Sequence, residues 1–346
     1  MRILVTGDKG YIGAVMVPML VQAGHSVVGL DSDWFEHSAF GAPRIEIPSK
    51  KKDLRDLEPS DLDGFDAVVH LAGLSNDPLG DLNPALTYEI NHVASVRLAK
   101  LAKEAGVERF LFSSSCSTYG AAGTEELLNE EAEFRPVTPY GRSKVLVEQD
   151  VVKLASSNFS PTFLRNATAY GVSPRLRFDL VLNNLVAWAH TTRRIYIKSD
   201  GTPWRPIVHI EDISRAFLSA LAAPRNLVHG QAFNVGRTEE NYQIRDLAKI
   251  VSETVPECKI EYAKDGSPDT RCYRVDFSKI NRVLPSFKPQ WNARKGAQEL
   301  YDAVRGSGLT MEEFEGPRYK RISHIQQLLS SGRLDANLRW RETVMA

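Results

Sequence analysis

The chain opens with MRILVTGDKGYIGAVMVPMLVQAGHSVVGLD, residues Met1–Asp31, and this stretch decides the fold. Ile3–Val5 is a short apolar run, which is typical of a strand buried on both faces. An apolar helical segment ends near Ala23, and His25–Leu30 predicts a second strand. The turn between the first strand and the helix holds three glycines with the spacing G-x-x-G-x-x-G: Gly7, Gly10 and Gly13.

Each part of this stretch suits a dinucleotide. The glycines let the backbone turn sharply and approach a pyrophosphate, whose charge meets the free N–H groups at the start of the helix. Asp31 closes the second strand, where its carboxylate can accept hydrogen bonds from a ribose 2′-OH and repel a 2′-phosphate. Ser32 and Asp33 follow, with no Arg, so the sequence favours NAD over NADP.

Composition bounds the partners and the compartment. The chain has 346 residues with 43 basic and 43 acidic side chains, so neither a nucleic acid nor an anionic membrane is expected as a partner. Three cysteines without C-x-x-C spacing argue against a zinc site or a disulfide framework and favour a reducing compartment. Because no apolar run approaches about 18 residues and a strand begins at once, we expect a cytoplasmic protein without a signal peptide.

Strands and helices alternate beyond Asp31, which predicts right-handed βαβ units. The fold class expected is α/β, a doubly wound parallel (Rossmann) sheet with a smaller C-terminal substrate domain. We expect an NAD-binding domain over residues 1–170 and a substrate-binding region over 171–346, with about 205–235 returning to the first domain. Residues 306–346 look helical, and their expected role is packing or a subunit contact in a homodimer.

A second constellation carries chemistry. Ser115 ends an expected strand, and Tyr140 and Lys144 lie at i and i+4, on one face of an expected helix. A phenol with a pKa near 10 is a poor base at neutral pH, but a neighbouring ammonium and a positive nicotinamide stabilise the phenolate. Tyr140 can then remove a proton from a sugar hydroxyl while Ser115 holds or relays that proton.

With these motifs in hand, the chain resembles the extended short-chain dehydrogenase/reductases, the nucleotide-sugar epimerases and dehydratases that include UDP-galactose 4-epimerase. The resemblance covers roughly residues 2–289 and rests on TGDKGYIG, HLAG at 70–73, SSSCSTYG at 113–120, PYGRSK at 139–144 and GTPWRPIVHIEDI at 201–213. It implies Ser115, Tyr140 and Lys144 as the catalytic set.

The resemblance also implies two sets of contacts. The cofactor contacts that it implies are Gly7, Gly10, Tyr11, Ile12, Gly13, Asp31, Asp53, Leu54, Leu71, Ala72, Gly73, Tyr140 and Lys144. The substrate contacts that it implies are Ser115, Ser117, Thr168, Asn184, Arg205 and Arg271. Arginine suits a diphosphate because its planar fork pairs with two phosphate oxygens. No metal site is implied.

Departures from the family pattern narrow the reaction. The 4,6-dehydratases place Asp-Glu directly after the catalytic Ser or Thr, and the decarboxylating relatives keep that Glu. Here Cys116 and Ser117 stand at these positions, which argues against both reactions. The 3,5-epimerising relatives place a Cys base where this chain has Ser117, so Cys116 can serve only if the loop shifts. We expect Cys116 to be a packed thiol.

Further departures concern the sugar pocket. Many relatives have an Asn at the position of Thr168, and the segment SPRLRFDL at 173–180 is unusually basic. Arg175 or Arg177 is therefore a candidate for phosphate binding. Tyr273 falls where a bulky residue limits room beside C2 in the 4-epimerases, which favours a 2-hydroxy over a 2-acetamido sugar.

The expected function is NAD-dependent epimerisation of a nucleoside-diphosphate sugar at C4 through a 4-keto intermediate. A sugar-nucleotide oxidoreductase (ketoreductase) and a 3,5-epimerase remain alternatives within enzymes. A non-catalytic dinucleotide-sensing protein is the alternative from another class. The residues do not identify the sugar or the nucleotide.

Overall fold

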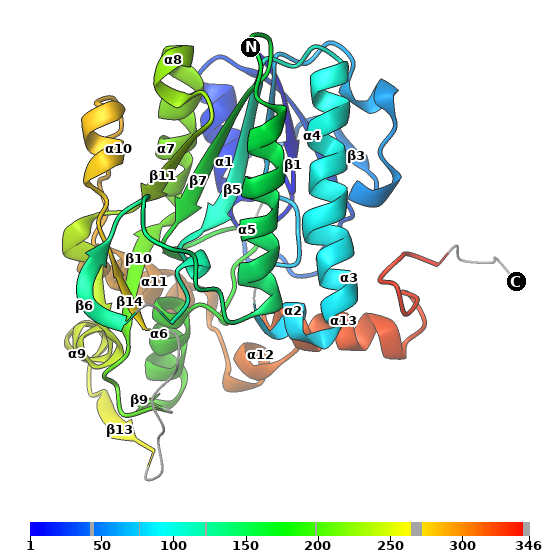
Figure 1. Cartoon of the computed structure of the whole chain (residues 1–346). Coiled ribbons are helices and arrows are strands. Elements are labelled where there is room, and N and C mark those ends of the chain that lie inside the picture. The colour runs from blue at the N-terminus through cyan, green and yellow to red at the C-terminus, as the bar shows by residue number, and fades with distance from the viewer. Residues whose placement is uncertain (42–44, 76, 122, 198, 264–271, 342–346) are drawn as a thin grey trace, which may run out of the picture.

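The computed structural model describes residues 1–41, 45–75, 77–121, 123–197, 199–263 and 272–341. Its centre is a seven-stranded sheet in which every pairing is parallel (Figure 1). In spatial order the strands are β11 (Gln231–Val235), β7 (Ser160–Asn166), β5 (Arg109–Ser115), β4 (Ala67–His70), β1 (Arg2–Thr6), β2 (Ser26–Asp31) and β3 (Ser49–Lys51). This order confirms the doubly wound parallel sheet.

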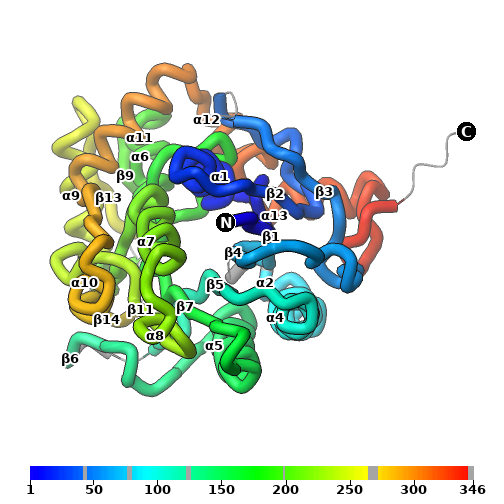
Figure 2. The backbone as a smooth tube through the Cα atoms, turned by 90° about the horizontal axis from the view of Figure 1, so that it is seen from above, coloured from blue at the N-terminus to red at the C-terminus, as the bar shows by residue number. Residues whose placement is uncertain are grey.

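Apolar side chains alternate between the two faces of this sheet. Ile3 and Val5 on β1 pack with α1 (Gly13–Gln22) and α7 (Ile210–Ala222), whereas Leu4 packs on the opposite face. That opposite face is covered by α4 (Ala94–Glu104) and α5 (Pro139–Val151), and Figure 2 shows the two pairs of helices on either side of the sheet. Because both faces are covered, the central strands β1 and β4 are buried and apolar over most of their length.

Two capping residues determine where the helices nearest the site begin. The side chain of Asn83 accepts a hydrogen bond from the N–H of Leu86 and caps α3 (Pro84–Tyr88), and the chain continues through a π-helical turn into α4. Thr138 caps α5 by accepting from Gly141, and Pro139 takes the first helical position, where its missing N–H costs nothing. Each cap satisfies an N–H that the helix leaves unpaired.

The remaining elements build a second core beside the sheet, around α6 (Val181–Thr192), α9 (Ile244–Thr254) and α11 (Ala293–Ser307). β11 lies in the main sheet although it comes late in the chain. The division into two domains remains a prediction.

The other strands are β6 (Gly123–Leu128), β8 (Thr168–Tyr170), β9 (Arg194–Ile197), β10 (Trp204–His209), β12 (Asn241–Gln243), β13 (Lys259–Tyr262) and β14 (Tyr273–Val275). The other helices are α2 (Asp77–Leu82), α8 (Arg225–Val228), α10 (Ser278–Val283), α12 (Met311–Glu315) and α13 (Arg321–Ser330).

The strand order reverses between β1 and β4, and ligands of such sheets bind in the crevice at that point, beyond the carboxyl ends of the strands. Within the described part of the chain, no helix has the length and apolar character needed to span a bilayer.

Candidate active site

A cavity of about 460 Å³ opens at the point where the strand order reverses. Its first wall is the glycine turn between β1 and α1. Gly7 has φ +79°, and a Cβ there would lie 2.8 Å from the backbone nitrogen of Ala72. A Cβ on Gly13 would lie 2.2 Å from the carbonyl oxygen of Gly7. Only glycine permits this close packing, which leaves a cradle that fits a pyrophosphate at the start of α1.

Asp31 lies at the rim of this cradle. Its carboxylate accepts hydrogen bonds from the backbone N–H of Asp33 (2.7 Å) and of Lys9 (3.2 Å), which fix its position at the end of β2. Burial raises the pKa of Asp31. The side chain lines the cavity, where a carboxylate can accept from a ribose hydroxyl.

Asp8 supplies a second buried carboxylate beside Asp31. Burial, and then the negative charge of Asp31, raise the pKa of Asp8 to about 6. A Cβ on Gly29 would lie 2.1 Å from Oδ2 of Asp8, so the glycine leaves room for this carboxylate against β2. Oδ1 of Asp8 is buried without a hydrogen-bond partner among the described residues.

Asp53 and Leu54, which the resemblance implies as cofactor contacts, also line the cavity. Both carboxylate oxygens of Asp53 are held by the guanidinium of Arg55, at 2.7 and 2.9 Å, and Asp53 also accepts from the N–H of Arg55. Leu54 is buried beside it. The cavity wall here therefore combines the apolar side chain of Leu54 with the carboxylate of Asp53, whose position is fixed and whose charge is balanced by Arg55.

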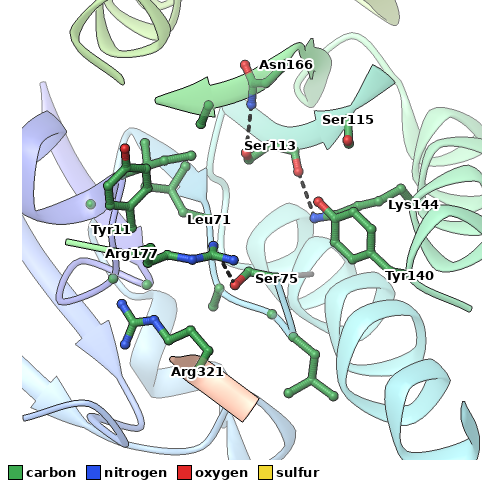
Figure 3. Close-up of a pocket in the computed structure, with 18 of the residues that line it drawn as sticks. Tyr11, Leu71, Ser75, Ser113, Ser115, Tyr140, Lys144, Asn166, Arg177 and Arg321 are labelled. Carbon is green, nitrogen blue, oxygen red and sulfur yellow. Dashed lines mark hydrogen bonds between the residues drawn. The ribbon is translucent and has the colours of Figure 1, made fainter. Parts of the chain in front are cut away.

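Tyr140 and Lys144 enter the cavity from α5 and Ser115 enters from the end of β5 (Figure 3). Nζ of Lys144 donates to the carbonyl oxygen of Ser113 at 2.8 Å and lies 5.6 Å from the centroid of the Tyr140 ring. Burial lowers the pKa of Lys144 to about 8, and the nearby Glu148 opposes this change. The ammonium therefore lies where it favours ionisation of the phenol.

Ser115 also organises the loop that follows β5. Its Oγ accepts hydrogen bonds from the N–H of Ser117 (3.1 Å) and from Oγ of Ser117 (2.9 Å). Both serines line the cavity. Asn166, from the neighbouring β7, donates to Oγ of Ser113 at 3.0 Å and also lines the cavity. These serine hydroxyl groups form a polar floor of the cavity.

Cys116 points away from this floor. Its Sγ donates to the carbonyl oxygen of Arg165 at 3.2 Å, and its side chain is 1% exposed within the core of the sheet. Burial raises the pKa of the thiol. A thiol in this position is a poor base because its anion has no solvation.

The residues predicted to contact the substrate divide into three groups. Ser115, Ser117, Thr168 and Arg205 line the cavity, as does Tyr273. Asn184 does not line it, because its amide donates to the carbonyl oxygen of Phe178 at 2.8 Å. Arg271 lies outside the described residues. Their roles remain predictions.

Arg177 joins the cavity from the basic segment after β8. Its guanidinium forms two hydrogen bonds of 2.9 Å with the carboxylate of Asp179 and donates to Oγ of Ser75 at 3.0 Å. Arg175, the other candidate, donates to the carbonyl oxygens of Lys9 and Glu36 and is not a lining residue. The nearby Asn183, rather than Asn184, supports this wall by donating to Tyr11 Oη and to the Arg177 carbonyl.

Several lining residues escaped sequence reasoning: Ser75, Asn166, Asp179 and Arg321. Asp179 lies in the basic segment at 173–180, in which only the arginines were considered, and Asn166 lies two positions before Thr168. Ser75 belongs to no motif, and Arg321 comes from the distant C-terminal helix α13. Among the described residues, no group of His, Cys, Asp and Glu side chains can hold a metal ion. The glycine cradle, the acid at the end of β2 and the cationic side chains together fit a dinucleotide.

Comparisons with known proteins point the same way. A model of the NAD dependent epimerase/dehydratase family matches residues 3–236, which include both the glycine turn and α5. UDP-glucose 4-epimerase of Bacillus subtilis is 27% identical over 328 residues, covering 87% of this chain and 94% of that protein. UDP-glucose 4-epimerase of Streptococcus mutans is 29% identical over 317 residues, covering 84% of this chain and 93% of that protein.

Solved structures agree in fold. MoeE5 in complex with UDP-glucose and NAD is 27% identical with a TM-score of 0.74, and MoeE5 in complex with UDP-glucuronic acid and NAD is 26% identical with a TM-score of 0.76. In both cases the match covers 89% of this chain and 100% of the other.

Proposed function

Because this chain belongs to the NAD dependent epimerase/dehydratase family, we propose that it is an NAD-dependent epimerase of a nucleoside-diphosphate sugar, acting at C4 through a 4-keto intermediate. The observation that carries the proposal is the meeting of Ser115, Tyr140 and Lys144 in one cavity with the glycine cradle. The 4-epimerase relatives, which match over most of their length, support it.

Tyr140 is the base in this proposal. Lys144 stabilises the phenolate, so that Tyr140 can take the proton of the sugar 4-OH near neutral pH. Ser115 holds the same hydroxyl: its Oγ accepts two hydrogen bonds from Ser117, which leaves its O–H to donate to the substrate oxygen. NAD, when bound, supplies a hydride acceptor that can return the hydride, so that the net reaction is not a redox change.

The sugar must then present either face to the cofactor. Inversion needs a cavity wide enough for the 4-keto sugar to turn, with its diphosphate held in place. Arg205, a predicted substrate contact that lines the cavity, is suited to the substrate diphosphate because its guanidinium can pair with two phosphate oxygens. Tyr273, which is 5% exposed, limits the space and favours a 2-hydroxy sugar.

The test is a substrate panel. The purified protein is assayed for bound NAD and then followed by NMR in D₂O with UDP-, dTDP-, GDP- and CDP-sugars. Inversion at C4 without solvent deuterium supports the proposal, because it requires internal return of the hydride. Consumption of added NAD(H) indicates an oxidoreductase, and deuterium at C3 or C5 indicates 3,5-epimerisation. Cofactor binding with no turnover of any sugar indicates a dinucleotide sensor.

We also propose a homodimer that resides in the cytoplasm. Three free thiols suit a reducing compartment, and the charge of the chain is balanced. Light scattering on the purified protein measures its oligomeric state, and fractionation of the source cells shows the compartment in which it resides. A monomer, or a protein recovered outside the cytoplasm, contradicts the respective statement.

A further inference from the structure

The C-terminal helix α13 lies beyond the segment matched by the family model, next to α2 at the carboxyl end of the sheet (Figure 1). Its apolar face belongs to a separate cluster that joins both rims of the cofactor cleft. Ile325 and Leu328 pack there with Trp34, from the loop after β2, and with Leu74, from the loop after β4. The helix therefore bridges the two loops between which a dinucleotide would lie.

Hydrogen bonds strengthen this bridge. Nε2 of His324 lies 2.8 Å from the carbonyl oxygen of Trp34, and the indole N–H of Trp340 donates to the carbonyl of Ser32 at 2.6 Å. These contacts hold α13 against the loop after β2. They therefore fix the position of Arg321, the first residue of the helix. A side chain placed in this way can have a specific binding role.

Arg321 lines the cavity and is only 4% exposed (Figure 3). Its guanidinium carbon lies 3.6 Å from the centroid of the Phe35 ring, and Nη2 makes one long hydrogen bond of 3.4 Å to the carbonyl oxygen of Arg175. Nη1 is buried with no hydrogen-bond partner in the described chain. No carboxylate among the described residues forms an ion pair with it. The neighbouring Arg177 has its charge balanced by Asp179.

A buried cation without an ion-pair partner is costly, because burial removes its hydration and the Phe35 ring and one long hydrogen bond replace only part of it. Burial, and then the positive charge of Arg177, lower the pKa of Arg321 to about 9. The ligand-free protein therefore holds a charge that an anion would stabilise. Arg321 lines the same cavity as the glycine turn, Asp31 and Phe35, so an anion that stabilises its charge would lie in that cavity.

We propose that Arg321 binds the diphosphate of the dinucleotide, so that the C-terminal helix α13 completes the cofactor pocket from outside the matched domain. The glycine turn offers N–H groups to one side of the diphosphate, and the fork of Arg321 offers two charged donors to the other. This inference concerns the cofactor only, so it stands or falls independently of the sugar substrate.

The experiment measures ligand affinity by calorimetry on cofactor-free protein. Arg321→Gln removes the charge, and Arg333→Gln is the matched control because Arg333 is an exposed arginine of the same segment, paired with Glu36. The ligands are NAD⁺, ADP-ribose, adenosine and NADP⁺. Arg321→Gln should weaken NAD⁺ and ADP-ribose by roughly 10- to 100-fold, the usual effect of losing hydrogen bonds to a charged group, and leave adenosine unchanged.

The outcomes separate the possible explanations. Unchanged affinity for NAD⁺ overturns the proposal, and so does an equal loss for adenosine, which indicates a general collapse of the pocket. A loss confined to NADP⁺ assigns Arg321 to a 2′-phosphate instead. If Arg321→Gln does not fold, Arg321→Lys decides: it keeps the charge without the fork, so NAD⁺ and ADP-ribose should weaken while adenosine does not. A matching loss for adenosine with Arg321→Lys also overturns the proposal.

Discussion

The carboxylate of Glu148 and the guanidinium of Arg165 form a buried ion pair that fastens α5 to β7. Nη2 of Arg165 lies 2.7 Å from Oε2, and Nε lies 3.1 Å from each carboxylate oxygen. Glu148 also accepts from Oγ of Ser114 on β5, at 2.5 Å. Because Glu148 lies one helical turn after Lys144, this pair fixes the helix face that carries the proposed base.

Glu148→Ala is therefore expected to reduce the free energy of unfolding by about 3–5 kcal/mol, because it leaves Arg165 buried and unpaired. The double variant Glu148→Leu with Arg165→Met removes both charges and should recover much of the loss. Urea unfolding of the parent protein, Glu148→Ala, the double variant and its two single variants, Glu148→Leu and Arg165→Met, checks this. If the double variant is as unstable as the sum of its two single variants, the ion pair is not the cause.

Tyr140→Phe should leave NAD affinity unchanged and reduce turnover by at least ~100-fold, the usual scale of acid–base catalysis. The substitution removes only the hydroxyl group and keeps the aromatic ring at this position of α5. Tyr196→Phe is a suitable control, since Tyr196 is exposed on β9. Turnover measured on the best substrate of the panel decides; an active Tyr140→Phe variant removes this residue from the mechanism.

Asp8 should make stability depend on pH in a predictable direction. Its pKa is raised in the folded protein to about 6 from 3.8, so the native state binds a proton more tightly than the unfolded state. The resulting destabilisation is absent below pH 4, grows between pH 4 and 6, and is complete above pH 6, reaching at most about 3 kcal/mol at 1.4 kcal/mol per unit.

Asp8→Asn should accordingly raise the free energy of unfolding at pH 7 and flatten its change between pH 4 and 6. Denaturant unfolding at several pH values, in cofactor-free protein, measures both effects. The exposed Asp63→Asn variant provides the control. An identical pH profile for Asp8→Asn and the parent protein would falsify the assignment.

Cys116 should resist alkylation in the native protein, since its thiol is buried and its pKa is raised by that burial. Cys258 and Cys272 are partly exposed and serve as internal controls for the reagent. Cys116→Ala should retain turnover, with no deuterium incorporated at C3 or C5 of the sugar. Mass spectrometry after brief alkylation gives the first result, and NMR in D₂O gives the second.

Much of the fold was readable from local patterns. The apolar run at Ile3–Val5, the glycine spacing and the alternation of strands and helices each depend on residues close in sequence, and the structure confirms the parallel sheet that they predict. Short strands such as β6, with the sequence GTEELL, were not predicted because they lack apolar alternation. Their pairing comes from distant partners, β14 in this case.

The candidate site likewise has features that depend on neighbouring residues and features that depend on distant segments. The glycine turn and the helix face with Tyr140 and Lys144 each depend on residues close in sequence. Backbone geometry sets the first and the helical period sets the second, so the sequence alone determined both. The orientation of Cys116 into the core, the choice of Asn183 over Asn184 and the arrival of Arg321 depended on packing between segments far apart in the chain. Burial and the pairing of charges arise only when those segments meet, and no periodicity in the sequence encodes which of them will do so.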